Sequence, residues 1–522
     1  MSDWPVIEIS EWDAPFDDER ALISLSAILP GYISGRRWYR AKARTIERLT
    51  IQDLISVPTA SAFILVVRIE YRDGGSDEYF VPLAVAQPGA AAALDEPVCE
   101  LRGPDGGEGV LYGVLSNVKF RQALLDVVVC DDVFEGRHGN LVGRRAKALD
   151  AECGDGAPRF ESFVSRAEQS NTSIIYGERY ILKLFRKLEQ GTNPDIEIGR
   201  FLTDRGFKNT PAVFGQIEYK TENGEAYTAG ILQQFVRNQG DAWSYTLKSL
   251  ERFFERAGAS AQDVSNDYLD AAALLGIRTA EMHAAFEDDD AGPDFVPEPF
   301  TSQDAQQLYQ DLLSQADIAF EALRRKQALL TGAAARAARD VLRLEPEVMA
   351  RFDALRNSSI SAVRIRHHGD YHLGQVLYTG SDFMIIDFEG EPARPLPERR
   401  RKALAMRDVA GMVRSFQYAA YAALFDAKAD GKLESAAEFW TQCVSGAYLK
   451  AYFSKTRDLR CVPSDAGEQK LLLDAFLLQK ALYEVAYEMN NRPDWVHIPL
   501  RGILSLMSPE PRAGVLPGPS GH

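Results

Sequence analysis

Three of the seven histidines of this chain fall within six residues, in a segment that also carries an acidic side chain. The segment is His367-His368-Gly369-Asp370-Tyr371-His372, and Leu373-Gly374-Gln375 follows it directly. A carboxylate on a loop of this kind can accept a proton from a hydroxyl group that attacks a phosphate. The pattern therefore indicates phosphoryl transfer with Asp370 as the base, and the alternative interpretation is a chance loop, because acidic residues near turns are common.

A β-hairpin is predicted directly after this loop. Val376–Tyr378 and Phe383–Ile386 are mostly apolar, and the turn Thr379-Gly380-Ser381-Asp382 separates them. Pairing about this turn places Gln375 opposite Asp387, give or take one residue, and opposed residues have Cβ atoms about 4.5–5.5 Å apart. Amide and carboxylate oxygens are ligands that Mg²⁺ accepts, so Gln375 and Asp387 are the predicted metal ligands.

A second tight hairpin is predicted earlier in the chain. Ser173–Tyr176 and Tyr180–Phe185 are its strands, and their register brings Lys183 near Thr172. A half-buried lysine at this position can bind nucleotide phosphates, and Glu197 on the next predicted helix can hold it by an ion pair. The alternative is an exposed lysine on an edge strand, which is the commoner situation for an isolated lysine.

The helix predicted over Glu468–Met489 has the side chains that a sugar acceptor requires. Aromatic rings provide faces for stacking, and charged groups bind hydroxyls. The alternative is that the aromatic residues pack in a core and that Lys480 and Glu484 form a surface pair of small energetic value. The two stripes at helical spacing are Lys480, Glu484 and Glu488, and Phe476, Tyr483 and Tyr487.

The composition limits the classes of function. A length of 522 residues corresponds to three or four domains of ~150 residues. The formal net charge of −16 argues against nucleic acid or an anionic membrane as a partner. The five cysteines are few and odd in number, no signal peptide is evident, and no apolar run reaches the ~18 residues of a membrane span. A cytoplasmic enzyme is expected.

Strands dominate the first half of the chain and helices the second half, which predicts two lobes of different texture. The predicted regions are a cap subdomain over 1–95, a strand-rich N-lobe over 96–236, a helical C-lobe over 237–507 and a disordered tail over 508–522. The predicted strands include Phe63–Tyr71, Glu78–Val85, Val127–Cys130, Phe160–Ala167, Val213–Lys220 and Thr228–Val236. The predicted helices include Ala21–Leu29, Tyr268–Phe286, Ala305–Leu330, Ala335–Ala354, Arg407–Phe425 and Ser435–Phe453.

Several segments together resemble the bacterial maltokinases, which belong to the aminoglycoside-phosphotransferase-like group of eukaryotic-type kinase folds. The segments are Arg366–Gln375, Ile386–Pro392, Arg407–Met412, Gly35–Lys42 near the start and Asn490–Trp495 near the end. The resemblance implies an α+β, bilobal protein-kinase-like fold with a cap subdomain. It also implies ATP-dependent phosphorylation of maltose at the anomeric hydroxyl, giving maltose 1-phosphate for α-glucan (glycogen) synthesis.

The resemblance also implies roles for individual residues. Asp370 is the catalytic base, Gln375 and Asp387 bind Mg²⁺, Lys183 binds a phosphate of ATP, and Glu197 orients Lys183. Because the chain lacks the Gly-x-Gly-x-x-Gly pattern of protein kinases, backbone donors to the phosphates are expected from Ser170, Asn171 and Thr172 instead. Gln234, Phe235 and Val236 would contact the adenine at the junction of the lobes. The residues expected at the sugar acceptor are His372, Glu389, Lys480, Tyr483, Glu484, Tyr487 and Arg492.

Two alternatives remain open. A glucosamine or aminoglycoside kinase of the same fold would need a site rich in carboxylates for its cationic acceptor, whereas the stripe that contains Lys480 favours a neutral sugar. A kinase-like module without activity could act as a scaffold for a partner such as trehalose synthase. The presence of Asp370, Gln375, Asp387 and Lys183 together argues against a scaffold.

Overall fold

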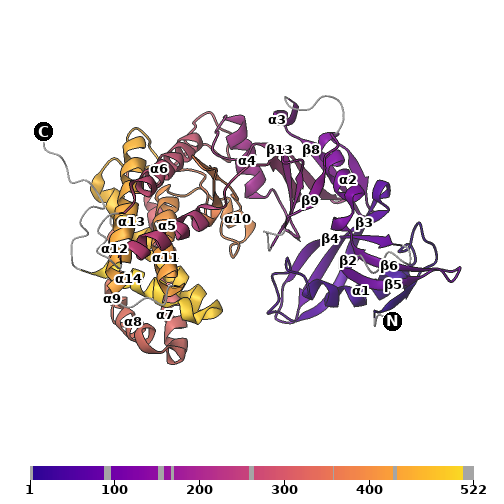
Figure 1. Ribbon diagram of the computed structural model, residues 1–522, viewed down its shortest axis with the longest axis horizontal. Coiled ribbons are helices and arrows are strands. Elements are labelled where there is room, and N and C mark those ends of the chain that lie inside the picture. Colours follow the sequence, from indigo (N-terminus) through magenta and orange to yellow (C-terminus); the bar gives the residue numbers. More distant parts are fainter. Residues whose placement is uncertain are drawn as a thin grey trace. The chain divides into compact units, whose positions relative to one another are not determined.

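The computed structural model describes residues 4–86, 96–150, 158–165, 170–257, 264–356, 358–426 and 432–508. The chain divides into two compact units, Met1–Arg237 and Asn238–His522, each with its own helices and strands (Figure 1). Apart from Ser508, the predicted tail lies outside the described residues. Within the described ranges, no helix is both long enough and apolar enough to cross a lipid bilayer.

The first unit begins with a mainly antiparallel sheet of order β1-β5-β6-β4-β3-β2, to which β12 adds on β4. Helix α1 (Glu19–Ser34) buries Ala21, Leu25, Leu29 and Ile33, which recur at helical spacing, and these side chains share one apolar cluster with the sheet. The predicted helix Ala21–Leu29 and the predicted strands Phe63–Tyr71 and Glu78–Val85 are found, and the two strands pair as β3 and β4. The strands are β1 (Val6–Glu8), β2 (Ile46–Val57), β3 (Ala62–Tyr71), β4 (Ser76–Ala86), β5 (Pro97–Arg102), β6 (Glu108–Gly113) and β12 (Lys187–Leu188).

The predicted boundary near residue 95 falls within a stretch that the structure does not describe. Strands β5 and β6 follow that stretch and belong to the same sheet as β1–β4. Apart from β12, the strands of the first sheet therefore end at Gly113.

The second sheet of this unit has the order β7-β8-β13-β14-β11-β10-β9. The predicted hairpin of β10 and β11 is found, and Gly177 and Glu178 close it with φ angles of 54° and 51°. The Arg179 N–H donates to the Tyr176 carbonyl at 3.0 Å, and Tyr176 pairs with Tyr180, so the connection between the strands has three residues, Gly177–Arg179. The strands are β7 (Val133–Glu135), β8 (Gly139–Arg145), β9 (Ser162–Val164), β10 (Thr172–Tyr176), β11 (Tyr180–Leu184), β13 (Val213–Thr221) and β14 (Ala226–Gln234).

The predicted strand Val127–Cys130 is wrong, because Val127–Val129 form the last turn of helix α2 (Val118–Val129) and Cys130 caps it. Asn117 starts the helix by accepting a hydrogen bond from the Lys119 N–H at 2.9 Å. The valines are buried in a core that contains residues of both sheets. Burial against these sheets outweighs the preference of β-branched residues for strands.

The second unit is mainly helical. The predicted helix Ala335–Ala354 consists of two helices, which meet at Leu344. Pro346 explains the break, because proline has no N–H to donate and is tolerated only in the first turn of a helix. The longer helices are α5 (Ala242–Ala257), α6 (Asn266–Phe286), α7 (Ser302–Lys326), α8 (Gly332–Arg343), α9 (Glu345–Arg356), α11 (Met406–Asp426), α12 (Lys432–Lys455), α13 (Ala466–Asn491) and α14 (His497–Met507).

One short hairpin interrupts these helices. Its strands are β17 (Val376–Tyr378) and β18 (Phe383–Ile385), and the turn between them is the predicted one. A separate pair of two-residue strands, β15 (Glu298–Pro299) and β16 (Val363–Arg364), precedes the His-Gly-Asp loop. The loop that contains Asp370 therefore lies between the short strands β16 and β17 within a mainly helical unit.

Candidate active site

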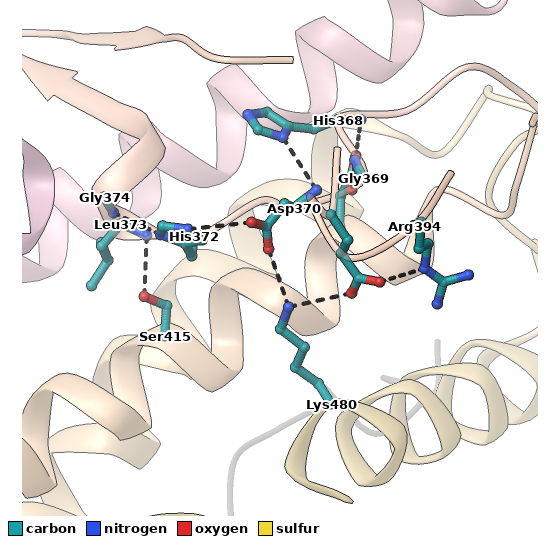
Figure 2. Close-up of polar contacts among 11 residues, drawn as sticks. His368, Gly369, Asp370, His372, Leu373, Gly374, Arg394, Ser415 and Lys480 are labelled. Atoms are coloured by element: carbon teal, nitrogen blue, oxygen red, sulfur yellow. Dashed lines mark hydrogen bonds and ion pairs between the residues drawn. The ribbon is translucent and has the colours of Figure 1, made fainter. Parts of the chain in front are cut away.

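Asp370 lies between two side chains that can carry positive charge (Figure 2). The Nζ atom of Lys480 lies 3.2 Å from Asp370 Oδ1, and Nε2 of His372 lies 3.8 Å from Asp370 Oδ2. Burial on its own would raise the pKa of Asp370, but Lys480 and His372 hold the pKa below its usual value. The carboxylate is therefore ionised at neutral pH and can accept a hydrogen bond or a proton.

Lys480 joins two acidic side chains. Its Nζ atom is also 3.6 Å from Oε1 of Glu391, and the other oxygen of Glu391 accepts a hydrogen bond from Arg394. Burial would lower the pKa of Lys480, but the charges of Asp370 and Glu391 raise the pKa above its usual value. Lys480 was predicted at the acceptor, and its contact with Asp370 was not predicted.

The loop that carries Asp370 is held by a buried carboxylate on α11. Asp408 accepts hydrogen bonds from the backbone N–H of His368 at 2.8 Å and of Gly369 at 3.0 Å. Burial would raise the pKa of Asp408, but a hydrogen bond from His283 and the neighbouring imidazoles hold the pKa far below its usual range. Gly369 has φ 84°, a conformation that glycine adopts without strain. Asp408 belongs to the segment Arg407–Met412, which resembles the maltokinases, but no role was predicted for it.

The hairpin β17–β18 positions the two predicted metal ligands at its open end. The observed register places Ile386 opposite Gln375, since the Ile386 N–H donates to the Gln375 carbonyl at 3.0 Å, one residue short of the expected Asp387 and within the allowance of the prediction. Asp387 follows with φ 66°. An amide oxygen and a carboxylate form a hard donor set that fits Mg²⁺, so the assignment of Gln375 and Asp387 stays a prediction consistent with the local geometry.

A small pocket lies beside Asp370 within the second unit. Its walls are mostly polar or charged, and α7, the loop after β18, α11 and α13 all contribute side chains. Three of the residues carry positive charge and three carry negative charge. The lining residues are Gln315, Gly369, Asp370, Tyr371, Glu391, Arg394, Arg407, Asp408, Gly411, Phe476, Gln479, Lys480 and Tyr483.

The other residues predicted at the acceptor divide into two groups. Tyr483 lines the pocket, and its ring stacks on Tyr487 with centroids 6.4 Å apart. Glu484 instead forms an ion pair with buried Arg414, and Arg492 bonds to Glu488 at 2.8 Å. These two pairs give Glu484 and Arg492 structural roles without any substrate, and their roles at the acceptor stay predictions, as does that of Glu389.

In the first unit, Lys183 forms an ion pair with Asp195, with Nζ 3.2 Å from Oδ2. Asp195 is buried in the first turn of α4 (Pro194–Asp204), two residues before the expected partner Glu197. Lys183 pairs across the hairpin with Ser173, one residue from the expected Thr172. A lysine held by a buried carboxylate has a fixed position, which is what a phosphate-binding lysine requires.

The loop before β10 was predicted to supply backbone donors to phosphates through Ser170–Thr172. The structure shows that Arg186 donates to the Thr172 hydroxyl at 2.9 Å, and that the guanidinium of Arg186 lies 5.0 Å from the ring of Trp38. Trp38 belongs to the segment Gly35–Lys42, one of the segments that resemble the maltokinases. Gln234 ends β14, and the Phe235 N–H donates to the Arg179 carbonyl at 2.9 Å.

Comparison with known proteins adds three findings. The family of the maltokinase N-terminal cap domain matches residues 32–113 of this chain, which overlap most of the first sheet. A glucosamine kinase of Mycolicibacterium smegmatis is 25% identical over 342 residues, which cover 65% of this chain and 78% of that protein. A glucosamine kinase of Streptacidiphilus jiangxiensis is 24% identical over 349 residues, which cover 65% of this chain and 72% of that protein.

Solved structures show a similar fold. A structure described as glucosamine kinase in complex with glucosamine, ADP and inorganic phosphate aligns with a TM-score of 0.62 at 19% sequence identity. The alignment covers 89% of this chain and 95% of that chain. The kinase-like fold predicted from the sequence is therefore confirmed.

Proposed function

Because the chain is a maltokinase-like phosphotransferase that acts on alcohol groups, we propose that it transfers the terminal phosphate of ATP to a hydroxyl group of a neutral sugar. The acceptor that fits best is maltose, phosphorylated at its anomeric hydroxyl to maltose 1-phosphate. The fold and the cap domain support the reaction class, and the charges beside Asp370 support the neutral acceptor.

The choice of a neutral acceptor rests on one observation: each carboxylate that lines the pocket already has a positively charged partner or backbone N–H donors. Asp370 and Glu391 both contact Lys480, Glu391 also contacts Arg394, and Asp408 is held by backbone N–H groups. Among the residues that the structure describes in this pocket, none is a carboxylate left over for an ammonium group. At an effective dielectric constant of 20, a protonated amine 4 Å from Lys480 would be repelled by about 4 kcal/mol. A neutral hydroxyl avoids this cost.

The proposed reaction uses Asp370 as the acceptor of the proton of the attacking hydroxyl. The lowered pKa of Asp370 keeps the carboxylate ionised, so the group also orients the hydroxyl before transfer. Positioning and charge neutralisation contribute most of the catalysis of phosphoryl transfer, and a strong base is not required. The stacked rings of Tyr483 and Tyr487 offer apolar faces for a glucose ring.

Gln375 and Asp387 would hold Mg²⁺, which neutralises charge on the phosphates when it is bound. Lys183, fixed by Asp195, would bind a phosphate of ATP. The backbone of Ser170–Thr172 would supply further donors, and Gln234–Val236 would contact the adenine. Phosphoryl transfer from MgATP needs a cation that binds the phosphates and side-chain oxygens that bind the metal. Lys183 would be the first of these, and Gln375 and Asp387 would supply the second.

Glucosamine is the second candidate acceptor, because two of the relatives described above are glucosamine kinases. An acceptor panel distinguishes the candidates. The full chain is assayed for ADP release with MgATP and maltose, glucosamine, an aminoglycoside or no acceptor, with Asp370→Asn as the background. We expect the kcat/KM for maltose to exceed that for glucosamine by roughly 10²- to 10³-fold.

A matched pair of variants on α13 tests the reason for this preference. Lys480→Met removes the positive charge beside Asp370, so Asp370 loses its lysine partner while Glu391 keeps Arg394, and we expect the glucosamine-to-maltose ratio of kcat/KM to rise. Lys470→Met removes an exposed lysine that pairs with Asp474 at 2.6 Å on the same helix, and should leave the ratio unchanged. A wild-type preference for glucosamine would show that the proposed acceptor is wrong. No turnover with any acceptor would instead favour a scaffold for a partner such as trehalose synthase.

A further inference from the structure

The pocket beside Asp370 contains a cation that no part of the reaction scheme above uses. Arg407 is the second residue of α11, and its side chain lines the pocket. Among the residues that the structure describes, Arg407 forms no ion pair, and its guanidinium makes a single hydrogen bond, from Nη2 to Oε1 of Gln479 at a long 3.5 Å. Most of the N–H groups of this guanidinium therefore lack a partner in the described part of the chain.

The other two cations of the pocket have carboxylate partners. Lys480 lies 3.2 Å from an oxygen of Asp370 and 3.6 Å from one of Glu391, and Arg394 bonds to the other oxygen of Glu391 (Figure 2). Burial and the nearby charge of Arg394 lower the pKa of Arg407, but a guanidinium stays protonated at neutral pH. A partly buried charge without a partner costs stability, and a ligand with oxygen atoms would compensate it.

The charges around the pocket limit the chemistry of this ligand. A cation would be repelled by Arg394, Arg407 and Lys480. An anion would instead meet the carboxylates of Asp370 and Glu391. A neutral group with several oxygen atoms avoids both repulsions.

The uncharged side chains of the pocket fit a sugar. Gln315 of α7 and Gln479 of α13 contribute amide groups, which both donate and accept hydrogen bonds, as hydroxyls do. Phe476 and Tyr483 line the same pocket, and the guanidinium of Arg407 lies 6.0 Å from the centroid of the Phe476 ring. Aromatic rings beside hydrogen-bonding groups match the C–H faces and the hydroxyls of a sugar ring.

We propose that Arg407 is a specificity-determining residue, whose guanidinium binds the hydroxyls at C2 and C3 of the sugar ring that is phosphorylated. A guanidinium presents parallel N–H groups in a fixed fork, and hydroxyls on adjacent carbons present two oxygen atoms side by side. The C2 and C3 hydroxyls are the adjacent pair nearest to an anomeric hydroxyl held at Asp370. This contact rests on the proposed function, which takes the anomeric hydroxyl as the group that reacts.

Discrimination at C2 follows from this contact. Glucose and glucosamine differ only at that carbon, where glucosamine carries an ammonium group instead of a hydroxyl. The hydroxyl accepts hydrogen bonds from the guanidinium, whereas the ammonium group has no lone pair to offer and is repelled. Arg407 would therefore add to the effect of Lys480 in favouring the neutral acceptor.

The experiment combines one change in the protein with one change in the acceptor. Wild type and Arg407→Met are assayed for ADP release with maltose and with 2-deoxymaltose, which lacks the C2 hydroxyl of the reducing ring. For the wild type we expect kcat/KM to be about 10- to 100-fold lower for 2-deoxymaltose, the effect of one hydrogen bond to a charged group. Arg407→Met should lower kcat/KM for maltose by about 100-fold, mainly through KM, and should treat the two sugars alike within about 3-fold.

Two further variants serve as comparisons. Arg407→Lys keeps the positive charge but loses the fork, so kcat/KM for maltose should recover only in part and stay about 10-fold below the wild type. Arg343→Met removes an exposed arginine of α8 that pairs with Asp340 at 3.1 Å, and it should leave the kinetics with both sugars unchanged.

Thermal unfolding separates a role in binding from a role in the fold. Arg407→Met removes an unpaired charge and breaks no ion pair among the described residues, so its Tm without ligand should equal or exceed that of the wild type. Maltose should raise the Tm of the wild type more than that of the variant, because a ligand that binds only the folded state stabilises it. A residue required for the fold would instead lower the Tm when it is replaced.

Several outcomes would overturn the role of Arg407 and leave the proposed function intact. One is a wild type that uses maltose and 2-deoxymaltose equally well. Another is an Arg407→Met variant that still distinguishes the two sugars by the wild-type ratio. A lower Tm of Arg407→Met with an equal loss for both sugars would assign the effect to the fold. If Arg407→Met does not fold, Arg407→Lys is taken through the same comparison.

A wild type that does not turn over maltose would reject the proposed acceptor, and calorimetric titration with the two sugars then decides about Arg407. Binding of maltose that weakens in Arg407→Met, with no such change for 2-deoxymaltose, would retain the contact without the proposed reaction. A wild type that binds no maltose would reject both proposals.

Discussion

The ionisable side chains around the His-Gly-Asp loop differ in whether their surroundings stabilise the charged form or the neutral form. Asp370, Asp408 and Lys480 each have partners of opposite charge or donors that stabilise the charged form. His367 has the opposite behaviour, because its burial lowers its pKa to about 4. The loop therefore contains a histidine that is neutral in the folded protein next to residues that are charged.

His367 makes the stability of the second unit depend on pH. The pKa is about 4 in the folded chain and about 6.5 in an unfolded one, so between these values the unfolded state binds the extra proton. Stability should therefore fall as the pH decreases from about 6.5 to about 4, by an order of 3 kcal/mol. Urea denaturation at several pH values measures this fall.

His367→Gln removes the titrating group and provides the comparison for that measurement. The difference in unfolding free energy between wild type and variant should change with pH across this window and stay constant above pH 7. A difference that stays the same from pH 7 to pH 4 would mean that His367 does not titrate with a lowered pKa. Because carboxylates titrate in both proteins, this difference isolates the contribution of His367.

At the scale of the elements, the hairpin β17–β18 is the feature on which the metal assignment depends. Asp387 follows β18 at the open end, and Asp382 lies at the turn, where it pairs with Arg278 at 2.7 Å. We expect Asp387→Asn to weaken Mg²⁺-dependent binding of ATP by about 10-fold or more, because a charged oxygen ligand is replaced by a neutral one. Isothermal titration calorimetry at several Mg²⁺ concentrations measures the effect.

Asp382→Asn is the control on the same hairpin. It removes an ion pair of Arg278 without changing a predicted ligand, so it should reduce stability and leave the Mg²⁺ dependence as in the wild type. If Asp387→Asn and Asp382→Asn behaved alike in titrations, Asp387 would not be a metal ligand.

The elements also show what the sequence could predict and what it could not. The hairpins β10–β11 and β17–β18 were predictable from the sequence, because each turn is formed by neighbouring residues that include glycine and polar side chains. Helix α2 was missed because its valines depend on burial against two sheets, which no local pattern reveals. The contact of Lys183 with Asp195 was not predicted, since a spacing on a helix does not say which carboxylates face inward, and the predicted role of Glu197 stays a prediction. Asn193 and Pro194 start α4 so that Asp195 is buried, and this cap was the available signal.

The roles of Asp408, His283 and Arg186 could not be predicted for a related reason. Each is a buried charged or polar side chain whose partners are distant in the sequence: Asp408 bonds to residues about forty positions earlier, and His283 bonds to α11 and α12. Buried polar groups are recognisable only when tertiary structure supplies their partners. The kinase-like fold and the phosphotransferase class were predictable, because their motifs are short and contiguous.

At the scale of the whole molecule, the chain consists of two units, each with an apolar core. We expect heat unfolding to deviate from a two-state transition, with a calorimetric enthalpy larger than the van't Hoff enthalpy. Differential scanning calorimetry tests this expectation. Phe120→Ala in α2 and Phe352→Ala in α9 each remove a fully buried ring, at a cost of about 3–5 kcal/mol.

These two variants should act on different parts of the unfolding curve. Phe120→Ala should shift the component that belongs to residues 1–237, and Phe352→Ala the component that belongs to residues 238–522. A single transition that both variants shift as a whole, with equal calorimetric and van't Hoff enthalpies, would show that the units unfold as one cooperative body.

The contact between α6 and α12 limits how this protein can be redesigned. A Cβ atom on Gly276 would lie 2.3 Å from the main-chain carbonyl oxygen of Tyr448, so the two helices touch there without room for any side chain. Thr279 and His283 follow on the same helix within two turns, and a shift of α6 would move both. A library that seeks new acceptors can vary the pocket residues on α13 but should keep Gly276, because even alanine there would displace α6 and, through Thr279 and His283, disturb the His-Gly-Asp loop that Gly276 does not contact.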